Sequence, residues 1–265
     1  MTDVLLEEEI YVTADFAQEM VTNAWAELRK RQSWIEESYA LTVDSVWIRR
    51  KDDWRAFAAH TFCVLLSLAP FYDWWAKEFG QDYTDQGDLF ELLTEESLVF
   101  HFIGWTVHRT GWARSNTANL SQIVDSVASC LGEELVHPGL WNQSGAKEMG
   151  LDLLCYRGFS DGRVGIPVYL MQCASSGNWK SKLHTPDLNV WNAMITFRNQ
   201  IQRAFSTPFS FLDEEFARNC VHVKGLFLDR CRLLKDSRAW ISQPLTHRII
   251  EWAEPRIEVL LEKSK

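Results

Sequence analysis

The chain has 265 residues, of which 46% are hydrophobic and 24% are charged, as is typical of a folded globular protein with a sizeable core. Its six cysteines include no C-x-x-C pair, so the sequence indicates neither a zinc knuckle nor a disulfide framework. The acidic start lacks the basic segment of a secretory signal, and the longest apolar run, residues 61–71, is too short to span a bilayer. We therefore expect a cytoplasmic protein with no membrane partner.

The formal net charge of −9 is unevenly distributed along the chain. Residues 1–100 hold 20 acidic and 8 basic residues, whereas the remaining residues hold 16 acidic and 19 basic ones. A surface for nucleic acid is therefore expected only in the second part, with modest attraction for phosphate. The acidic first part is expected to bind a protein partner or a second copy of the chain, or to restrain the second part.

Apolar residues at helical spacing predict that the first part of the chain is helical. Residues 15–31 and 51–68 carry such stripes, Pro70 ends the second helix, and a third helix is expected over residues 89–107. Residues 116–135 form a further amphipathic helix, with an apolar stripe that runs from Leu120 to Leu131.

The period then changes from that of a helix to that of a strand. Residues 150–157 and 165–174 are short, apolar and rich in β-forming residues, and the turn signal Ser160-Asp161-Gly162 between them predicts an antiparallel hairpin.

A helical stretch over 186–205, a third strand within 221–234 and a closing helix over 245–262 follow. The order of elements predicts a mixed α/β domain over residues 113–265, preceded by an all-helical N-terminal region over residues 1–112.

Three residues on these elements are candidates for a site. Asp152 heads the first apolar strand, where a carboxylate is costly unless it is paired or binds a metal. Gln172 ends the second strand. Glu134 falls on the apolar stripe of the helix at 100° per residue and is expected to face the sheet, whereas Glu133 faces water. Taken singly, each has a simpler explanation: an exposed strand edge, a solvated rim residue and a frayed helix end.

In this order and on these elements, residues 116–182 resemble the restriction-endonuclease-like PD-(D/E)XK nuclease superfamily, and its Mrr-like branch in particular, with weaker support from residues 225–234. The resemblance implies a mixed central sheet flanked by helices and a Mg²⁺ ion, which Mn²⁺ would replace. Its ligands would be Asp152, Glu134, Gln172 and the main-chain carbonyl of Cys173. It also implies a metal-dependent endonuclease that cuts duplex DNA, in defence against foreign DNA.

The sequence departs from the family at its lysine, because Ala174 stands two residues after Gln172. In some family members the lysine lies on a neighbouring element, and Lys180 or Lys182 is the candidate here. Lys182 is favoured, because a buried Trp179 would turn it back towards the site; it would orient water and stabilise the phosphate. The alternative is a catalytically degenerate nuclease fold that acts as a DNA-binding or scaffold subunit of a larger complex. An RNA substrate also stays open.

Overall fold

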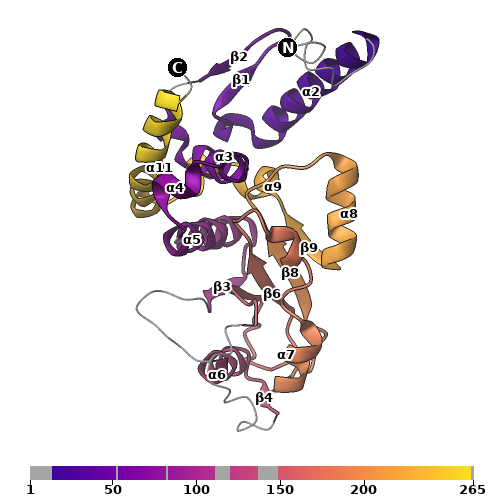
Figure 1. The fold of residues 1–265 in the computed structure, drawn as a ribbon. Helices are drawn as coiled ribbons and strands as arrows, with labels where there is room; N and C mark the ends of the chain where they lie inside the picture. The colour runs from indigo at the N-terminus through magenta and orange to yellow at the C-terminus, as the bar shows by residue number, and fades with distance from the viewer. Residues whose placement is uncertain (1–13, 52, 82, 111–119, 137–148, 264–265) are drawn as a thin grey trace.

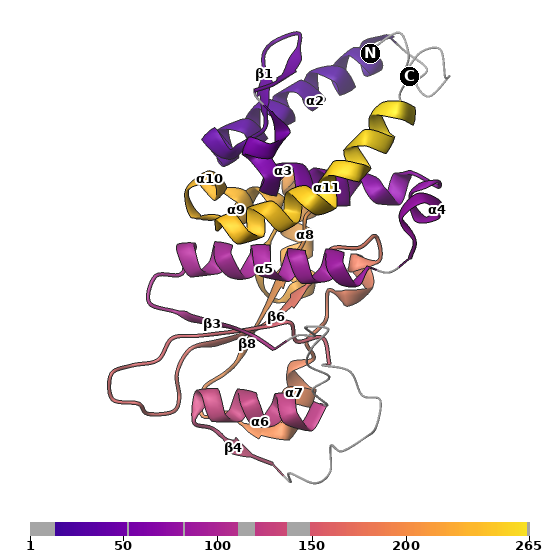
Figure 2. The ribbon, with the colours of Figure 1, turned by 90° about the vertical axis from the view of Figure 1, so that its left-hand side faces the viewer.

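The structure is a computed structural model that describes residues 14–51, 53–81, 83–110, 120–136 and 149–263. It has a mixed α/β fold, in which helices cover both faces of a five-stranded sheet (Figures 1 and 2). The strands of this sheet lie in the order β3-β5-β6-β8-β9, and their bounds are β3 Thr106–Arg109, β5 Leu153–Tyr156, β6 Val168–Cys173, β8 Gln202–Ser206 and β9 Gly225–Leu228.

The sheet combines an antiparallel meander with parallel strands. β3, β5 and β6 are antiparallel, with Leu153 opposite Met171, and this confirms the predicted hairpin. β6, β8 and β9 are parallel, with Gln172 opposite Phe205. The carboxyl ends of these three strands therefore lie at one edge of the sheet, and the start of β5 lies at the same edge.

Helices surround the sheet in layers. α5 lies between the sheet and a further helical layer that contains α3 and α11, and α6 and α7 cover the opposite face (Figure 2). The α-helices are α2 Ala14–Ile35, α3 Ala58–Leu68, α4 Trp75–Phe79, α5 Thr84–His101, α6 Leu120–Leu131, α7 Leu188–Met194, α8 Asp213–Val223, α9 Arg230–Leu234, α10 Ser237–Trp240 and α11 Gln243–Lys263. Short 3₁₀ helices are η1 Glu36–Ser38, η2 Trp54–Phe57, η3 Ala69–Phe71 and η4 Trp179–Lys182.

Strand alternation assigns side chains to the two faces of the sheet. Leu153, Met171 and Ala204 pack in one cluster with α3 and α5, whereas Leu154 and Leu170 pack with α6 and α7. Both faces are apolar because both are covered.

Two predictions about the elements are wrong. The N-terminal region is not all-helical, because β1 Leu41–Val43 and β2 Ile48–Arg50 form an antiparallel hairpin and β3 joins the central sheet. The stretch 186–205 is helical only over α7; β7 Ile195–Thr196 and β8 follow, since pairing with distant strands overrides the local helical pattern.

The helix expected over 116–135 ends at Leu131 among the described residues, and residues 116–119 lie outside them. Gly132 adopts φ +66°, its N–H donates to the Ser129 carbonyl at 3.3 Å, and the Glu133 N–H donates to the Ala128 carbonyl at 3.0 Å. This is a Schellman cap, and glycine provides its left-handed residue. The chain then enters β4 Glu134–Leu135, which pairs with β7.

The boundary expected at residue 112 falls between two neighbouring strands, β3 and β5. One hydrophobic cluster also joins residues of α3 and α5 to residues of β5, β6 and α11. The segment Trp54–Phe71 is long and apolar enough to cross a membrane by length and composition, and 44% of it is buried inside the protein. Phe62 and Leu66 of this segment belong to the joint cluster.

We expect Gly225→Ala to destabilise the protein by about 1–3 kcal/mol, because an added Cβ would overlap the backbone carbonyl of Arg203 where β8 and β9 approach. Gly87→Ala in α5 is the control, since nothing lies within 4 Å of its added Cβ. That variant should be up to about 1 kcal/mol more stable. Urea unfolding measures both changes, and equal stability of the two variants would contradict the close packing of β8 on β9.

A second expectation concerns acid. His60 is 2% exposed, and its Nε2 has no hydrogen-bond partner among the described residues. Burial, and then the charge of Arg230, lowers the pKa of His60 to about 3. The unfolded chain therefore binds a proton below pH ~6.5 that the folded chain does not. The free energy of unfolding decreases as the pH is lowered, by about 2 kcal/mol at pH 5. His60→Leu should remove this acid dependence in urea titrations at pH 7 and pH 5, and the exposed His247→Leu should not.

Candidate functional site

Asp152 lies immediately before β5 and is held at the end of the hairpin. Its backbone N–H donates to the Met171 carbonyl at 2.9 Å, so strand pairing continues one residue beyond β5. Its side chain is 5% exposed, and Oδ2 accepts the Cys173 backbone N–H at 2.5 Å. The prediction that Asp152 simply lies at an exposed edge is therefore wrong, and the carboxylate is buried because donors surround it.

Gln172 supplies the second donor to this carboxylate. Its Nε2 donates to Asp152 Oδ2 and, at 3.2 Å, to the Cys173 carbonyl. Its Oε1 lies 3.1 Å from the Thr185 hydroxyl. The amide must present its NH₂ to Asp152, because the reverse orientation would place oxygen against oxygen. Gln172 is 5% exposed and not a solvated rim residue.

Thr185 connects this pair to the loop that follows β6. Its hydroxyl lies 2.6 Å from the Lys182 carbonyl, and its backbone N–H donates to the same carbonyl at 2.9 Å. Since a hydroxyl has one proton, Thr185 donates either to Lys182 or to Gln172 at one time. Thr185 thus connects the end of η4 to Gln172.

Gly150 makes this close packing possible. It adopts φ +72°, and an added Cβ would lie 2.7 Å from Thr185 Cβ and 2.8 Å from Gln172 Oε1. The Gly-Leu-Asp sequence therefore places a residue without a side chain against the amide that holds Asp152.

The position where the family has its lysine is part of the core. Ala174 is 1% exposed, its N–H donates to the Ser206 carbonyl at 2.9 Å, and it packs in a cluster with Trp179 and Phe205. A lysine at this position would have to place its stem in this cluster. The alanine that stands in place of the family's lysine is therefore a residue of the hydrophobic core.

The two candidate lysines are in different environments. The Lys180 side chain is 71% exposed and lies 3.9 Å from Glu215, so its ammonium is directed towards α8. Lys182 is half-buried and forms no ion pair with a residue that the structure describes. Trp179 is buried against Phe209 and Phe211, as the sequence predicts.

The structure does not bring Glu134 to the site, so the prediction that it faces the sheet is wrong. Its side chain is 75% exposed and pairs with Arg198 at 2.9 Å. The neighbouring Glu133, predicted to face water, is 4% exposed and accepts hydrogen bonds from Gly165 and Arg198. The Schellman cap at Gly132 causes both errors. It ends α6 before Glu133 and Glu134, so the helical spacing does not predict where these two side chains point.

Glu91 of α5 is a carboxylate that the sequence analysis did not select. Burial, and then the charges of Asp152 and Glu91, raises the pKa of the Cys173 thiol well above its usual range. Glu91 also lies 3.4 Å from Arg109 of β3. Its helix was predicted, but the packing of that helix on the sheet was not.

The oxygen donors around Asp152 fit a hard divalent cation in their chemistry. The Asp152 carboxylate and the Cys173 carbonyl both accept from the Gln172 NH₂, so these two oxygens lie close together, while the Gln172 Oε1 faces Thr185. Mg²⁺ is commonly bound through one or two carboxylates while it keeps several waters. Among the described residues, no group of three or more His, Cys, Asp and Glu side chains is placed to hold a metal ion. The donor set therefore fits a hydrated Mg²⁺ and not a closed protein cage.

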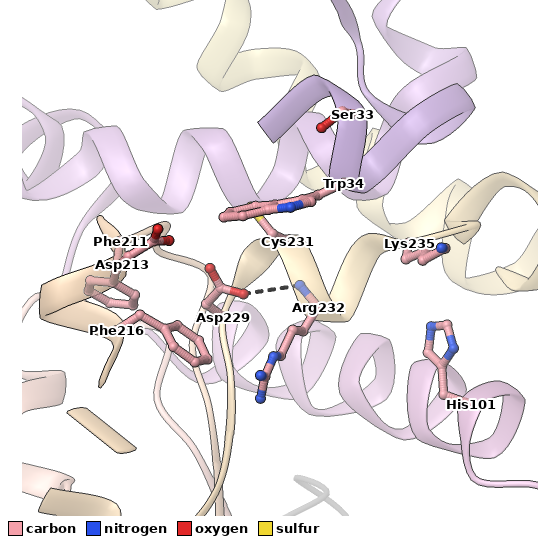
Figure 3. A pocket seen from close by; sticks show the side chains of 10 residues that line it. All are labelled: Ser33, Trp34, His101, Phe211, Asp213, Phe216, Asp229, Cys231, Arg232 and Lys235. Atoms are coloured by element: carbon pink, nitrogen blue, oxygen red, sulfur yellow. Dashed lines mark hydrogen bonds between the residues drawn. The ribbon is translucent and has the colours of Figure 1, made fainter. Parts of the chain in front are cut away.

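A cavity of about 550 Å³ lies elsewhere, between α2, α8 and α9 (Figure 3). Neither Asp152 nor Gln172 lines it. Asp229 at its wall accepts the Arg232 backbone N–H at 3.0 Å and so caps α9. Arg232 donates to the Phe227 carbonyl at 3.0 Å. These contacts give both residues a structural role.

Comparisons with family models, with curated proteins and with solved structures find no match to this chain.

The Asp152–Gln172 contact gives a prediction about charge. Gln172→Glu replaces the donor NH₂ by a second buried carboxylate, so one of the two acids should have a raised pKa. A carboxyl group whose pKa is raised in the folded state lowers the stability of the protein as the pH rises above ~4.3, which is the pKa of this group in the unfolded chain. We expect a loss of roughly 2–4 kcal/mol at pH 7 and little loss at pH 4.

Mg²⁺ should restore much of this stability at pH 7, since two carboxylates bind it better than one. Thermal unfolding with Mg²⁺ and with EDTA measures the effect, and Gln172→Met, which adds no charge, is the control. A pH-independent loss in Gln172→Glu would show that the two side chains do not meet.

Proposed function

We propose that this chain is a metal-dependent nuclease of the restriction-endonuclease-like class that acts on DNA. The support is the arrangement at the carboxyl edge of the sheet, where a buried aspartate at the head of β5 meets a glutamine at the end of β6. The mixed sheet, with an antiparallel hairpin followed by a parallel strand, agrees with this class. A role in defence against foreign DNA remains part of the proposal and follows from the resemblance alone.

In this proposal the Asp152 carboxylate and the Cys173 carbonyl would hold Mg²⁺ or Mn²⁺, and Gln172 would join them through Oε1 only if its amide turns over. Glu91 would take the place of Glu134 as the carboxylate on a helix, because its helix α5 packs on the face of the sheet that carries Cys173. The bound metal would lower the pKa of a water and polarise the scissile phosphate. Gln172 keeps Asp152 fixed through its NH₂, and Thr185 keeps Gln172 fixed through its hydroxyl.

Lys182 is the proposed cation of the site. The observation that carries this assignment is the link through Thr185, whose backbone N–H donates to the Lys182 carbonyl while its hydroxyl can donate to Gln172 Oε1. This link holds η4 against the site. The ammonium of Lys182 has no carboxylate partner among the described residues, so it is available for a phosphate or a water. Its role would be to orient the attacking water and stabilise the charge that develops on the phosphate.

One observation favours the second candidate, a degenerate nuclease fold that binds DNA or acts as a scaffold in a larger complex. Ala174 is fixed in the core where the family has its lysine. Under this alternative the purified chain binds duplex DNA but does not cut it with Mg²⁺ or Mn²⁺. A protein partner at the acidic N-terminal region belongs to either candidate, and the exposed apolar residues Phe16 and Met20 of α2 agree with it.

Cleavage of duplex DNA by purified variants tests the proposal. Asp152→Ala should abolish Mg²⁺-dependent cleavage, because it removes the one carboxylate in the set formed with Gln172 and Cys173. Lys182→Met should lower the rate by about 10²–10³-fold, as expected for loss of a group that stabilises transition-state charge. Lys180→Met should lower it by no more than a few-fold.

Circular dichroism and thermal unfolding control for folding of each variant. Cleavage by Asp152→Ala at the wild-type rate would make the site assignment wrong. A larger loss in Lys180→Met than in Lys182→Met would make the lysine assignment wrong. A wild-type protein that binds but does not cut would favour the scaffold.

A further inference from the structure

Arg230 carries a positive charge that makes no direct ion pair with a residue the structure describes. The residue is half-buried at the start of α9, directly after β9. Its Nε donates to Ser210 Oγ at 2.9 Å and its Nη1 lies 3.4 Å from Ser67 Oγ. It forms no ion pair within the part of the chain that the structure describes. Hydroxyl groups satisfy its N–H donors in part, and the neighbouring Asp229 interacts with its charge without a direct ion pair.

Burial is the main feature of the surroundings of Arg230, and it lowers the pKa of this guanidinium. The neighbouring Asp229 caps α9 and faces the other cavity, beneath Trp34 (Figure 3). A partly buried charge without a direct ion pair is costly, so an anion bound at this place would offset part of the cost.

A cavity of about 480 Å³ gives access to this guanidinium. Ser67 and Ser210 line it beside Arg230, and Lys180 lies at its rim with its ion-pair partner Glu215. A guanidinium fork flanked by hydroxyl groups is the donor set that matches the tetrahedral oxygens of a phosphate.

We propose that the cavity in front of Arg230 is a phosphate-binding site, with Arg230, Ser67 and Ser210 as the donors. The segments that form it follow three parallel strands: 177–180 follows β6, Ser210 follows β8 and Arg230 follows β9. Ligands of open α/β sheets bind at this carboxyl edge. The proposal does not rest on nuclease activity, because none of these donors belongs to the Asp152 site.

The position of the cavity favours the backbone phosphate of a nucleic-acid strand as its occupant. Asp152 and Gln172 lie at β5 and β6, and Arg230 lies two strands away from β6, about 10 Å at the usual strand spacing. At ~3.4 Å per nucleotide along one strand, this separation corresponds to about three nucleotides. A strand that lies along the edge would reach both places.

Phosphate binding is tested on the full chain in EDTA, where metal-dependent cleavage cannot occur. Thermal unfolding with inorganic phosphate and fluorescence anisotropy with a labelled duplex oligonucleotide are measured for wild type, Arg230→Met and Arg232→Met. Arg230→Met should remove the phosphate-induced rise in Tm and weaken DNA binding about ten- to hundredfold. Arg232→Met, two residues along α9 and facing the other cavity, should behave as wild type in both assays.

Arg230→Met should fold, because an apolar side chain of similar size replaces a buried charge. If it does not, Ser210→Ala still decides the question, and a several-fold weaker response to phosphate is expected. Loss of the phosphate response with unchanged DNA binding would support a free phosphate compound as the occupant. Equal responses of wild type, Arg230→Met and Ser210→Ala to phosphate and to DNA would overturn the site, whatever the outcome of the cleavage assays.

Discussion

The contact between the Asp152 carboxylate and the end of β6 organises the site. A buried carboxylate is tolerated only when hydrogen bonds replace its hydration, and here the Cys173 N–H and the Gln172 amide do so. Because Gln172 is fixed by Asp152 on one side and by Thr185 on the other, the loop from β6 to α7 is held against the sheet. The position of Lys182 therefore depends on an interaction that lies outside its own helix.

The sheet topology places the contact between Asp152 and Gln172 at the edge where the parallel strands end. The antiparallel hairpin brings the start of β5 beside the end of β6, and the parallel pairing of β6, β8 and β9 brings three strand ends to the same place. Apolar clusters cover both faces of the sheet, so polar groups that converge must do so beyond the strand ends. Apolar packing therefore occupies the two faces of the sheet, and the polar groups of the candidate site lie at its edge.

The sequence predicts what depends on local pattern. The hairpin and the places of Asp152 and Gln172 follow from strand alternation and a turn signal, and the structure confirms the hairpin. Glu134 was misplaced because the Schellman cap at Gly132 ends α6 early, although that glycine was a readable signal. Glu91 and β8 could not be found in this way, since the docking of α5 and the parallel pairing of β8 are made by residues far apart in the chain.

The charges at the carboxyl edge are compensated to different degrees, and the differences follow the strand order. Asp152, beside β6, has an amide and a backbone N–H as donors. Asp229, after β9, has the backbone of α9, and burial raises its pKa. The Arg230 side chain has only hydroxyl groups as hydrogen-bond partners. In the two proposals above, a cation would bind at β5 and β6 and an anion would bind at the end of β9. A nucleic-acid strand with its counter-cation would complement both ends of this edge at once, and it would offset the part of the burial cost that the protein's own hydrogen bonds leave.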